Sequence, residues 1–450
     1  MSINKKSFTC FEQLALHLEQ HIPTLFVASK TSTVIAYDQL ETHSSGFCLG
    51  DLSGMPKNLS LDAEGILQVL GPVTWKEARA FCRSKNRDIM TAPTEELATV
   101  LAGLATSATG ERCFGFGTLR DQVSKIKYLD YNGQEQLLQH ENDVLGLLEK
   151  QAKVECRQIL NQYQQTYRPY LAFKNAPFPR LLKETDLLIG TEGQLGVITQ
   201  AQIKTLEMTD VSFVFILLPK WEEDYSLHLK IFSCVQTKRE NIFSCELLDD
   251  NSLNVLPGQR PGKRGQDLIF LEMPSQQLPS IMSQILDQIP QLDESNIFEI
   301  SGNKCHQLRM QVPRATFEAN AAAGVVKMGT DVQVRPDKIG QLLDLYREFA
   351  RLGIGYNLFG HFGDAHLHFN FLPTSEQLPF CQLKFEKFYS QVFDLHGSPF
   401  AEHGVGFIKQ KFIKKFYNLW QYNMFEILKN SFDPHHQFFP GGFMHLKATL

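Results

Sequence analysis

The sequence predicts an α+β protein in which helices cover the faces of β-sheets. Strand-like and helix-like segments alternate after about residue 207, and shorter strand–turn signals precede them. Hydrophobic residues make up 43% of the chain and charged residues 21%, as in an ordinary globular protein. The 450 residues allow roughly two or three domains, each with its own core.

The N-terminal part begins with a predicted helix and strand. Residues 8–20 show helical periodicity, and residues 24–28 (TLFVA) are strand-like and lead into the polar turn SKTST. Thr74 and Glu77 have the spacing of a capping box, which predicts that a helix begins there.

Glycine and other small residues mark later segments of this part. Asn132-Gly133, within KIKYLDYNGQEQLL, favours a type I′ hairpin. Residues 93–123 are rich in small residues, which lets the backbone approach a ligand or another element closely. Residues 186–199 (DLLIGTEGQLGVIT) are strand-like, with glycines interleaved.

The second half alternates more regularly. VSFVFILLP, DLIFLEM and NIFEIS are predicted strands, and the predicted helices are 222–235, 278–289, 339–353, 379–396 and 407–432. Asp433-Pro434 ends the last helix. Elements in this order fit a sheet whose helices lie on one face.

Charge, cysteines and hydropathy narrow the function classes. A net charge of −5 gives no general attraction to nucleic acid. The nine scattered cysteines, without a C-x-x-C pair, indicate reduced thiols. No apolar run has the length of a signal peptide or a membrane span, so we expect a cytoplasmic protein, with peripheral attachment to the inner face of a membrane as the alternative. The lysines of FIKQKFIKKF are expected to form a solvated helix face.

The stretch GHFGDAHLHFN gathers polar side chains among Phe and Leu: His361, Asp364, His366, His368 and Asn370. Burying such groups without partners costs on the order of a few kcal/mol each, so they should pair with each other, a metal ion or a substrate. A Gly363-Asp364 turn would fold the stretch into a hairpin, in which His361 faces His366 or, with a loop of about four residues, His368. With Glu402 from the next motif, two imidazoles make either a His₂–carboxylate metal site or a hydrogen-bonded polar cluster.

Neither glycine-rich segment contains a dinucleotide fingerprint or a P-loop, so a nicotinamide or ATP site is not indicated. Motifs in both halves nevertheless stand in the order of one family. They are carried by Pro93, Thr99, Gly110 and Gly117; by 190–196; by His361, Gly363, Asp364, His368 and Asn370; and by Glu402, His403, Gly404, Gly406 and Lys409. Over about residues 70–445 the chain resembles the flavoprotein oxidoreductases that include vanillyl-alcohol oxidase, D-lactate dehydrogenase, glycolate oxidase and D-2-hydroxyglutarate dehydrogenase.

This resemblance implies a domain organisation and a cofactor. It implies a two-subdomain FAD-binding domain of the PCMH type at 1–206 with a shortened N-terminus, a ferredoxin-like α+β substrate (cap) domain at 207–400, and a C-terminal helical return at 401–450 that closes the active site. FAD would be bound non-covalently, because no His or Cys matches the family's attachment sites. The implied FAD contacts are Ser29, Lys30, Thr31, Ser32, Thr33, Pro93, Thr94, Thr99, Ser107, Gly110, Gly117, Glu192, Gly193 and Ile198.

The resemblance also implies a reaction, the oxidation of a D-2-hydroxy acid of the lactate, glycolate or 2-hydroxyglutarate class by hydride transfer to flavin. His403 would take the hydroxyl proton, and Arg309 would grip the substrate carboxylate. Lys327 is a second candidate for the substrate carboxylate, and Asn370 belongs to the same implied catalytic set.

Metal and partners follow from the same resemblance. His361, His368 and Glu402 would hold zinc or another divalent ion, and His366 could compete as a ligand. The implied partners are the hydroxy acid and an electron acceptor, which could be a quinone, an electron-transfer protein or oxygen. A homodimer is one option for the assembly.

Departures from the family pattern keep two alternatives open. Residues 28–33 (ASKTST) replace a glycine-rich pyrophosphate loop, and Leu101-Ala102 replaces a pair of glycines. One alternative is a flavoenzyme like alkylglycerone-phosphate synthase, to which the additional His366 points. The other is a degenerate flavin fold retained as a binding subunit.

Overall fold

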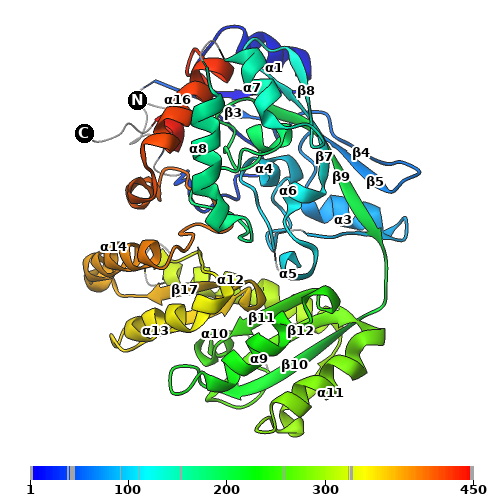
Figure 1. Ribbon diagram of the computed structural model, residues 1–450, viewed down its shortest axis with the longest axis vertical. Coiled ribbons are helices and arrows are strands. Elements are labelled where there is room, and N and C mark those ends of the chain that lie inside the picture. The colour runs from blue at the N-terminus through cyan, green and yellow to red at the C-terminus, as the bar shows by residue number, and fades with distance from the viewer. Residues whose placement is uncertain are drawn as a thin grey trace. The chain divides into compact units, whose positions relative to one another are not determined.

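Two compact units make up the chain. The computed structural model describes residues 4–37, 40, 46–91, 93–110, 112–152, 155–256, 258, 260–322, 324 and 328–445 (Figure 1). Unit 1 comprises Met1–Thr109, Thr118–Met208 and Glu402–Leu450, and unit 2 comprises Gly110–Gly117 and Thr209–Ala401. Each unit combines sheets and helices, which confirms the α+β fold class. The assignment of functions to 1–206, 207–400 and 401–450 stays a prediction.

Unit 1 contains two sheets. The first is parallel, with the order β1-β3-β2, and consists of β1 (Asn4–Ser7), β2 (Thr24–Val27) and β3 (Cys48–Asp51). The second is antiparallel, with the order β4-β5-β9-β7-β8 and β6 paired to β9. Its strands are β4 (Asn58–Leu61), β5 (Ile66–Leu70), β6 (Arg87–Ile89), β7 (Val123–Leu129), β8 (Glu135–Gln139) and β9 (Val197–Glu207). Leu67 and Val69 of β5 are fully buried between partly exposed neighbours, the pattern of a strand with one buried face.

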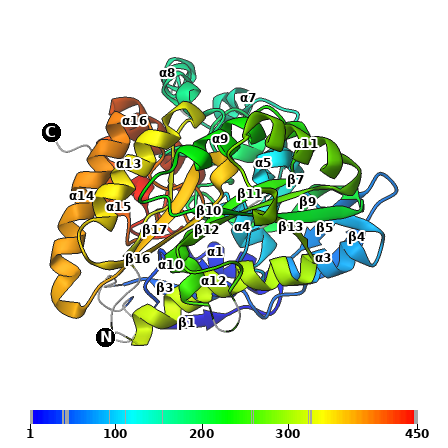
Figure 2. The ribbon, with the colours of Figure 1, turned by 90° about the horizontal axis from the view of Figure 1, so that it is seen from below.

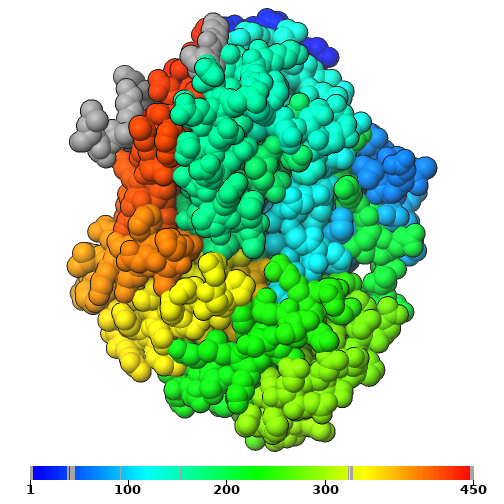
Figure 3. All heavy atoms as spheres, viewed as in Figure 1, coloured from blue at the N-terminus to red at the C-terminus, as the bar shows by residue number. Residues whose placement is uncertain are grey.

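Helices of unit 1 pack around these sheets. They are α1 (Phe11–Leu18), α3 (Trp75–Arg83), α4 (Val100–Ala105), α6 (Leu119–Gln122), α7 (Val144–Gln151), α8 (Arg157–Tyr167), α15 (Gln410–Ile413) and α16 (Leu419–Phe432), with the 3-10 turns η1 (Arg168–Tyr170), η2 (Glu184–Leu187), η9 (Lys414–Phe416) and η10 (Phe443–His445). The predicted capping box of α3 is confirmed, because the Glu77 N–H donates to the Thr74 hydroxyl and the Glu77 carboxylate accepts from the Thr74 N–H. The outer side of α8, in blue-green, forms part of the visible surface of unit 1 (Figure 3).

Unit 2 is built on an antiparallel sheet with the order β13-β10-β12-β11-β16-β17-β14, and β15 also pairs with β17. Its strands are β10 (Val211–Pro219), β11 (Ser244–Leu248), β12 (Gln266–Pro274), β13 (Ile297–Ile300), β14 (Met328–Gly329), β15 (Val332–Gln333), β16 (Gly355–Gly360) and β17 (His366–Leu372). The helices are α5 (Cys113–Phe116), α9 (Ser226–Gln236), α10 (Asp250–Asn254), α11 (Leu278–Gln288), α12 (Gly302–Ala322), α13 (Ile339–Ala350) and α14 (Leu378–Asp394), with the 3-10 turns η3 (Arg239–Asn241), η4 (Ser275–Gln277), η5 (Glu294–Asn296), η6 (Pro336–Lys338), η7 (Phe362–Asp364) and η8 (Ser375–Gln377).

Helices cover both faces of the unit 2 sheet, so the prediction of helices on one face is wrong. Helix α12 lies on one face, where Cys305, Leu308 and Val312 pack into a core with residues of β10, β11, β12 and β16. Helices α9, α11, α13 and α14 lie on the other (Figure 2). There Tyr346 of α13 stacks on Phe369 of β17. The polar sequence of α12 hides its buried stripe, which explains why it was missed.

Other local predictions need correction. The hairpin between β7 and β8 forms, but Asn132 has a negative φ and only Gly133 is positive at 72°, so the turn is not type I′. Within 186–199, only residues from Val197 onward are strand, because positive φ at Gly190 and Gly193 keeps the preceding backbone in turns. The predicted helix 407–432 is divided into α15, η9 and α16, because Asn418 caps a new helix.

No helix in the described part of the chain combines the length and the apolarity that crossing a membrane requires.

Candidate functional site

Glu192 joins two of the sequence motifs within unit 1. Its carboxylate accepts hydrogen bonds from the Val405 N–H at 2.5 Å and the Gly406 N–H at 3.0 Å. Burial raises the pKa of Glu192 above its ordinary value, against the effect of these two donors. A Cβ at Gly404 would lie 2.5 Å from the Glu192 carboxylate, so glycine is required for this approach.

The turn after α4 contacts the same motif. The Gly190 N–H donates to the Leu104 carbonyl at 3.2 Å, and the Glu192 N–H donates to the Ala105 carbonyl at 2.8 Å. Ser107, with φ at 52°, accepts a hydrogen bond from Arg120 at 2.9 Å, and Arg120 is itself paired with Asp186 at 3.0 Å. The two glycine-rich segments of the sequence are therefore neighbours.

Residues 29–33 follow β2 as a loop in which Ser29, Lys30 and Thr33 are exposed and Thr31 and Ser32 are half-buried. Lys30 forms an ion pair with Asp51, the last residue of β3, at 2.8 Å. The loop leads to Val34, whose carbonyl accepts a hydrogen bond from the Phe407 N–H at 3.1 Å. Segments around residues 30, 105, 192 and 405 thus form one cluster of loops in unit 1.

This loop cluster has the features that a buried, polar cofactor needs. The Thr191 hydroxyl is fully buried and has no hydrogen-bond partner among the described residues. Space is open beside Gly193, where φ is 72°. A bound group such as FAD could occupy the open space and form a hydrogen bond with this buried hydroxyl.

The other predicted FAD contacts are more dispersed. Thr99 is the N-cap of α4, Ile198 lies on β9, and Pro93 and Thr94 lie half-buried in the loop before α4. Gly110 and Gly117 belong to unit 2. Their segment is held there because the Gly115 N–H donates to the Phe243 carbonyl and Arg112 pairs with Glu272.

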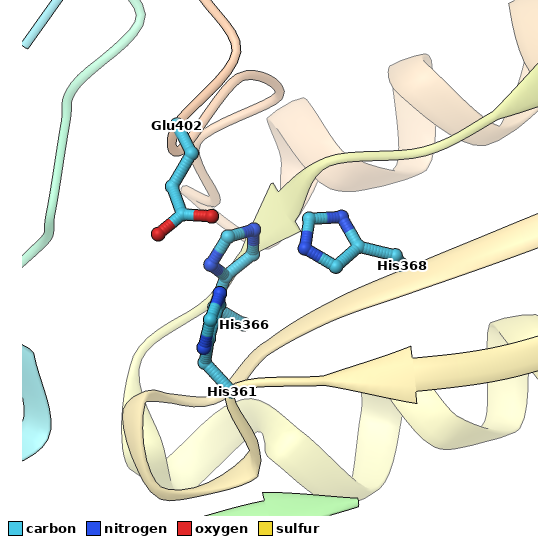
Figure 4. A group of neighbouring side chains, drawn as sticks. All are labelled: His361, His366, His368 and Glu402. Carbon is cyan, nitrogen blue, oxygen red and sulfur yellow. The ribbon is translucent and has the colours of Figure 1, made fainter. Parts of the chain in front are cut away.

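In unit 2, the hairpin β16–η7–β17 brings three imidazoles together. One ring nitrogen from each of His361, His366 and His368 lies within 4.8 Å of the others, and the rings gather at the end of the hairpin (Figure 4). All three side chains are buried. The left-handed backbone at Ala365, with φ at 52°, closes the turn between the two strands.

The hairpin register confirms the first of the two predicted partners of His361, which is His366, and shows that a four-residue loop does not pair His361 with His368. Phe359, not His361, lies opposite His368, and the His366 N–H donates to the His361 carbonyl at 3.2 Å. The loop 362–365 therefore has four residues and places His361 opposite His366, whereas a pairing of His361 with His368 would need the six-residue loop 362–367. The ring centroids of His361 and His368 still lie 5.8 Å apart.

Each imidazole is oriented by an acceptor on one of its nitrogens. His361 Nδ1 lies 2.9 Å from Glu246 Oε1, and His366 Nε2 lies 2.9 Å from Asp331 Oδ1. His368 Nδ1 lies 3.3 Å from the Thr330 carbonyl. Such outer partners fix the tautomer and direction of a histidine and are typical of metal ligands. The donor set of three nitrogens thus fits a divalent metal.

Glu402 is the first residue of the last segment of unit 1, directly after Ala401, whose N–H donates to the Asp331 carbonyl at 2.9 Å. Within unit 1 the Glu402 Oε1 atom accepts hydrogen bonds from Thr109 at 2.7 Å and from Lys174 at 3.0 Å. Lys174 is 1% exposed, so its ammonium is a buried partner of this carboxylate.

The remaining predicted catalytic residues are placed separately. His403 is half-buried and follows Glu402, and Arg309 is half-buried on α12. Asn370 is 1% exposed on β17. Lys327 lies outside the described residues.

Lys174, Thr109, Glu246 and Asp331 were not singled out in the sequence. Lys174, Glu246 and Asp331 are single polar residues without a motif around them, whereas Thr109 lies within the small-residue segment 93–123. The partner of each is far away in the chain. Lys174 stands in the apolar run YLAFKNAPF and Glu246 in a strand, so a charge at each of these positions was the available signal.

Known proteins resemble this chain in sequence and fold. Residues 223–442 match the family model "FAD linked oxidases, C-terminal domain". The D-lactate dehydrogenase of Archaeoglobus fulgidus is 22% identical over 398 residues, which are 85% of this chain and 78% of that protein. The mitochondrial D-lactate dehydrogenase [cytochrome] of Kluyveromyces lactis is 24% identical over 50% of this chain and 41% of that protein.

Glycolate oxidase subunit GlcD of Bacillus subtilis is 22% identical over 57% of this chain and 56% of that protein. The chain thus spans less than two thirds of the length of the Kluyveromyces and Bacillus relatives. A solved structure of alkyldihydroxyacetonephosphate synthase shares the fold, with a TM-score of 0.64 and 13% identity over 97% of this chain and 76% of that one. Residues 223–442 are thus similar to the C-terminal domain of FAD-linked oxidases.

Proposed function

We propose that the protein binds FAD non-covalently and oxidises a D-2-hydroxy acid to the 2-oxo acid. The family supports FAD, and the names of the relatives support a hydroxy acid of the lactate or glycolate class. The observation that carries the proposal is the group of three buried, oriented imidazoles in unit 2. The loop cluster around Glu192 and Thr191 is the proposed FAD contact in unit 1.

A divalent metal, for which zinc is our first choice, is proposed to bind His361, His368 and Glu402. The carboxylate partner of His361 and the carbonyl partner of His368 leave the Nε2 atom of each ring as the ligand. The Asp331 partner of His366 lies on Nε2 and would leave the Nδ1 atom of that ring as a further candidate ligand. A metal here would bind the substrate's hydroxyl and carboxylate oxygens and lower the pKa of the hydroxyl.

The proposed chemistry divides between residues. When bound, FAD supplies the acceptor for the hydride that leaves the substrate's C2 carbon. His403 takes the proton of the C2 hydroxyl, because an imidazole can accept a proton near neutral pH. Arg309 pairs with the substrate carboxylate, whose two oxygens match a guanidinium, and Asn370 and Lys327 assist in binding.

The remaining sequence-based assignments also stay proposals. The FAD-binding domain is proposed at 1–206, the substrate domain at 207–400 and the closing segment at 401–450. The electron acceptor is a quinone, an electron-transfer protein or oxygen. A cytoplasmic location and a homodimer remain our working proposals.

A second candidate is a flavoenzyme like alkylglycerone-phosphate synthase. It is favoured by the third imidazole, His366, within 4.8 Å of the other two. A fold likeness of this kind does not by itself transfer a reaction.

The visible spectrum of the purified protein tests the proposed function. We expect a yellow protein that releases FAD when it is denatured, and whose flavin is bleached anaerobically by D-lactate or D-2-hydroxyglutarate. A colourless protein that also fails to bind added FAD would leave the binding-subunit alternative. A flavin that no 2-hydroxy acid bleaches would favour the second candidate.

A further inference from the structure

Three buried asparagines lie on one face of unit 2, next to the imidazoles. Asn320 is 1% exposed on α12, Asn357 is fully buried on β16, and Asn370 is 1% exposed on β17. Asn357 and Asn370 are direct cross-strand partners, so their side chains leave the same face of the sheet. Thr316, one helical turn before Asn320, accepts a hydrogen bond from Asn357 at 2.7 Å, which places α12 over this pair.

The orientation of each amide is fixed by its partner. The Asn357 Nδ2 atom donates to the Thr316 hydroxyl, whose own proton goes to the Val312 carbonyl. The Asn320 Nδ2 atom donates to the Thr316 carbonyl at 3.0 Å, and the Asn370 Nδ2 atom lies 3.5 Å from the His368 carbonyl. The Thr316 and His368 carbonyls only accept, and the Thr316 hydroxyl has already donated its proton to Val312, so each amide directs its nitrogen toward its partner.

The three amide oxygens are therefore acceptors, and none has a donor among the described residues. Buried acceptors are costly to leave unpaired, so a group that donates hydrogen bonds belongs here. No lysine or arginine in the described part of unit 2 is fully buried. We call Asn320, Asn357 and Asn370 the amide pocket.

The amide pocket adjoins the proposed reaction centre. Asn370 stands two residues after His368, which is about 7 Å along the strand and on the same face. If His368 lies at the C2 hydroxyl, a hydroxyl on C3 or C4 of the same molecule can extend to the pocket. A second carboxylate would instead meet three acceptor oxygens.

We infer that the amide pocket binds a hydroxyl group of the substrate, so that the substrate is a 2-hydroxy acid with a further hydroxyl at C3 or C4, and not a dicarboxylate. This inference rests on the proposed function and narrows its substrate class. Asn320 and Asn357 are specificity-determining residues in it.

Four acids test the inference: D-lactate, D-glycerate, D-erythronate and D-2-hydroxyglutarate. Dissociation constants are measured by calorimetry on the flavin-loaded protein under anaerobic conditions with the flavin reduced, and rates of flavin bleaching are measured separately. We expect D-glycerate or D-erythronate to bind at least about tenfold more tightly than D-lactate. An acid without the further hydroxyl leaves the buried amide oxygens unpaired and therefore binds more weakly. D-2-hydroxyglutarate should bind most weakly.

Asn357→Leu and Asn320→Leu should reduce that preference to within about threefold, because they weaken binding of the hydroxylated acids more than binding of D-lactate. Ser252→Ala is the matched control, because the Ser252 hydroxyl donates to the carbonyl of Leu358 on the same strand and is equally buried. It should leave the preference intact. Rescue by Asn357→Gln, which keeps an amide oxygen, would separate acceptor loss from strand damage.

The experiment distinguishes an error in this inference from an error in the proposed function. If D-lactate bleaches the flavin and no hydroxylated acid is preferred, or if Asn357→Leu weakens all acids alike, buried water satisfies the amide oxygens and the inference is wrong. If D-2-hydroxyglutarate binds most tightly, the pocket does not reject a carboxylate and the inference is also wrong. If none of the acids binds or bleaches the flavin, the proposed function and this inference fall together.

Discussion

Asp249 is a buried carboxyl group in unit 2, at the N-cap of α10. Burial next to Asp267 raises the pKa of Asp249 to about 8. The folded protein therefore holds this proton between the carboxyl's ordinary pKa and about pH 8, whereas the unfolded chain releases it. The contribution of Asp249 to the free energy of unfolding is therefore fully present below that window. As pH rises through the window, this contribution decreases by up to about 1.4 kcal/mol per pH unit.

Asp249→Asn removes this proton exchange while it keeps an oxygen for the Ser252 N–H. Between pH 6 and pH 8.5, the free energy of unfolding of the variant should rise by about 2 kcal/mol relative to that of wild type. Thermal or urea unfolding at each pH measures this difference. Asp250→Asn is the control, because Asp250 forms ion pairs with Arg260 and Lys220, which lower the pKa of its carboxyl group. Its stability difference from wild type should stay constant over that range. A constant difference for Asp249→Asn as well would show that this carboxyl is ionised when folded.

His403 and Arg309 should separate in kinetics if their proposed roles are right. His403→Ala should slow reduction of the flavin by about 10²- to 10⁴-fold with little effect on substrate binding, because it removes a base and not a contact. Arg309→Ala should mainly weaken binding of the substrate, because it removes the partner of the carboxylate. Anaerobic stopped-flow bleaching measures both. Equal bleaching rates in wild type and His403→Ala would remove His403 from the mechanism.

The hairpin β16–η7–β17 makes the metal proposal specific, because it carries all three imidazoles. We expect a divalent metal to co-purify, and His361→Ala and His368→Ala to lose it. His366 is not one of the three proposed ligands, so His366→Ala should keep the metal. Glu246→Gln should weaken metal affinity by about 10- to 100-fold, since it alters the partner that orients His361. Elemental analysis after dialysis measures each case.

Chelation completes that test. If activity survives thorough chelation and no divalent metal co-purifies, the imidazoles bind substrate directly and the metal proposal is wrong. Loss of metal in all three histidine variants would instead make His366 a ligand. Restored activity on re-addition of zinc or manganese would support the site as proposed.

Local elements could be predicted because their signals lie within a few residues. The capping box of α3 and the apolar run of β10 are of this kind. The partners of buried polar groups could not be predicted, because the paired residues are far apart in sequence. Glu402 and Thr109 are 293 positions apart, and His366 and Asp331 are 35 positions apart. The turn at Gly133 was misjudged in type because its neighbour's φ depends on the closure of both strands. Sequence therefore identified the imidazoles, and the structure identified what orients them.

The chain order of unit 1 determines how a bound ligand should affect the whole molecule. This unit is assembled from separate segments, and the loop cluster joins residues near 30, 105, 192 and 405 by hydrogen bonds. A ligand that contacts the cluster should therefore protect all of these segments at once, although they are far apart in sequence. At a concentration about 100-fold above its dissociation constant, FAD should stabilise the folded state by about 2.7 kcal/mol.

Hydrogen exchange measured by mass spectrometry on flavin-free protein, with and without added FAD, tests this directly. We expect slower exchange in peptides covering 29–34, 104–107, 190–196 and 404–408 together, because each contributes a hydrogen bond to the same cluster. Gly404→Ala is the matched variant, because its Cβ would meet the Glu192 carboxylate at 2.5 Å and separate two of the segments. In that variant FAD should bind more weakly, and any protection should be lost first at 404–408. Protection confined to peptides of unit 2 would place the flavin elsewhere and contradict an FAD-binding domain at 1–206.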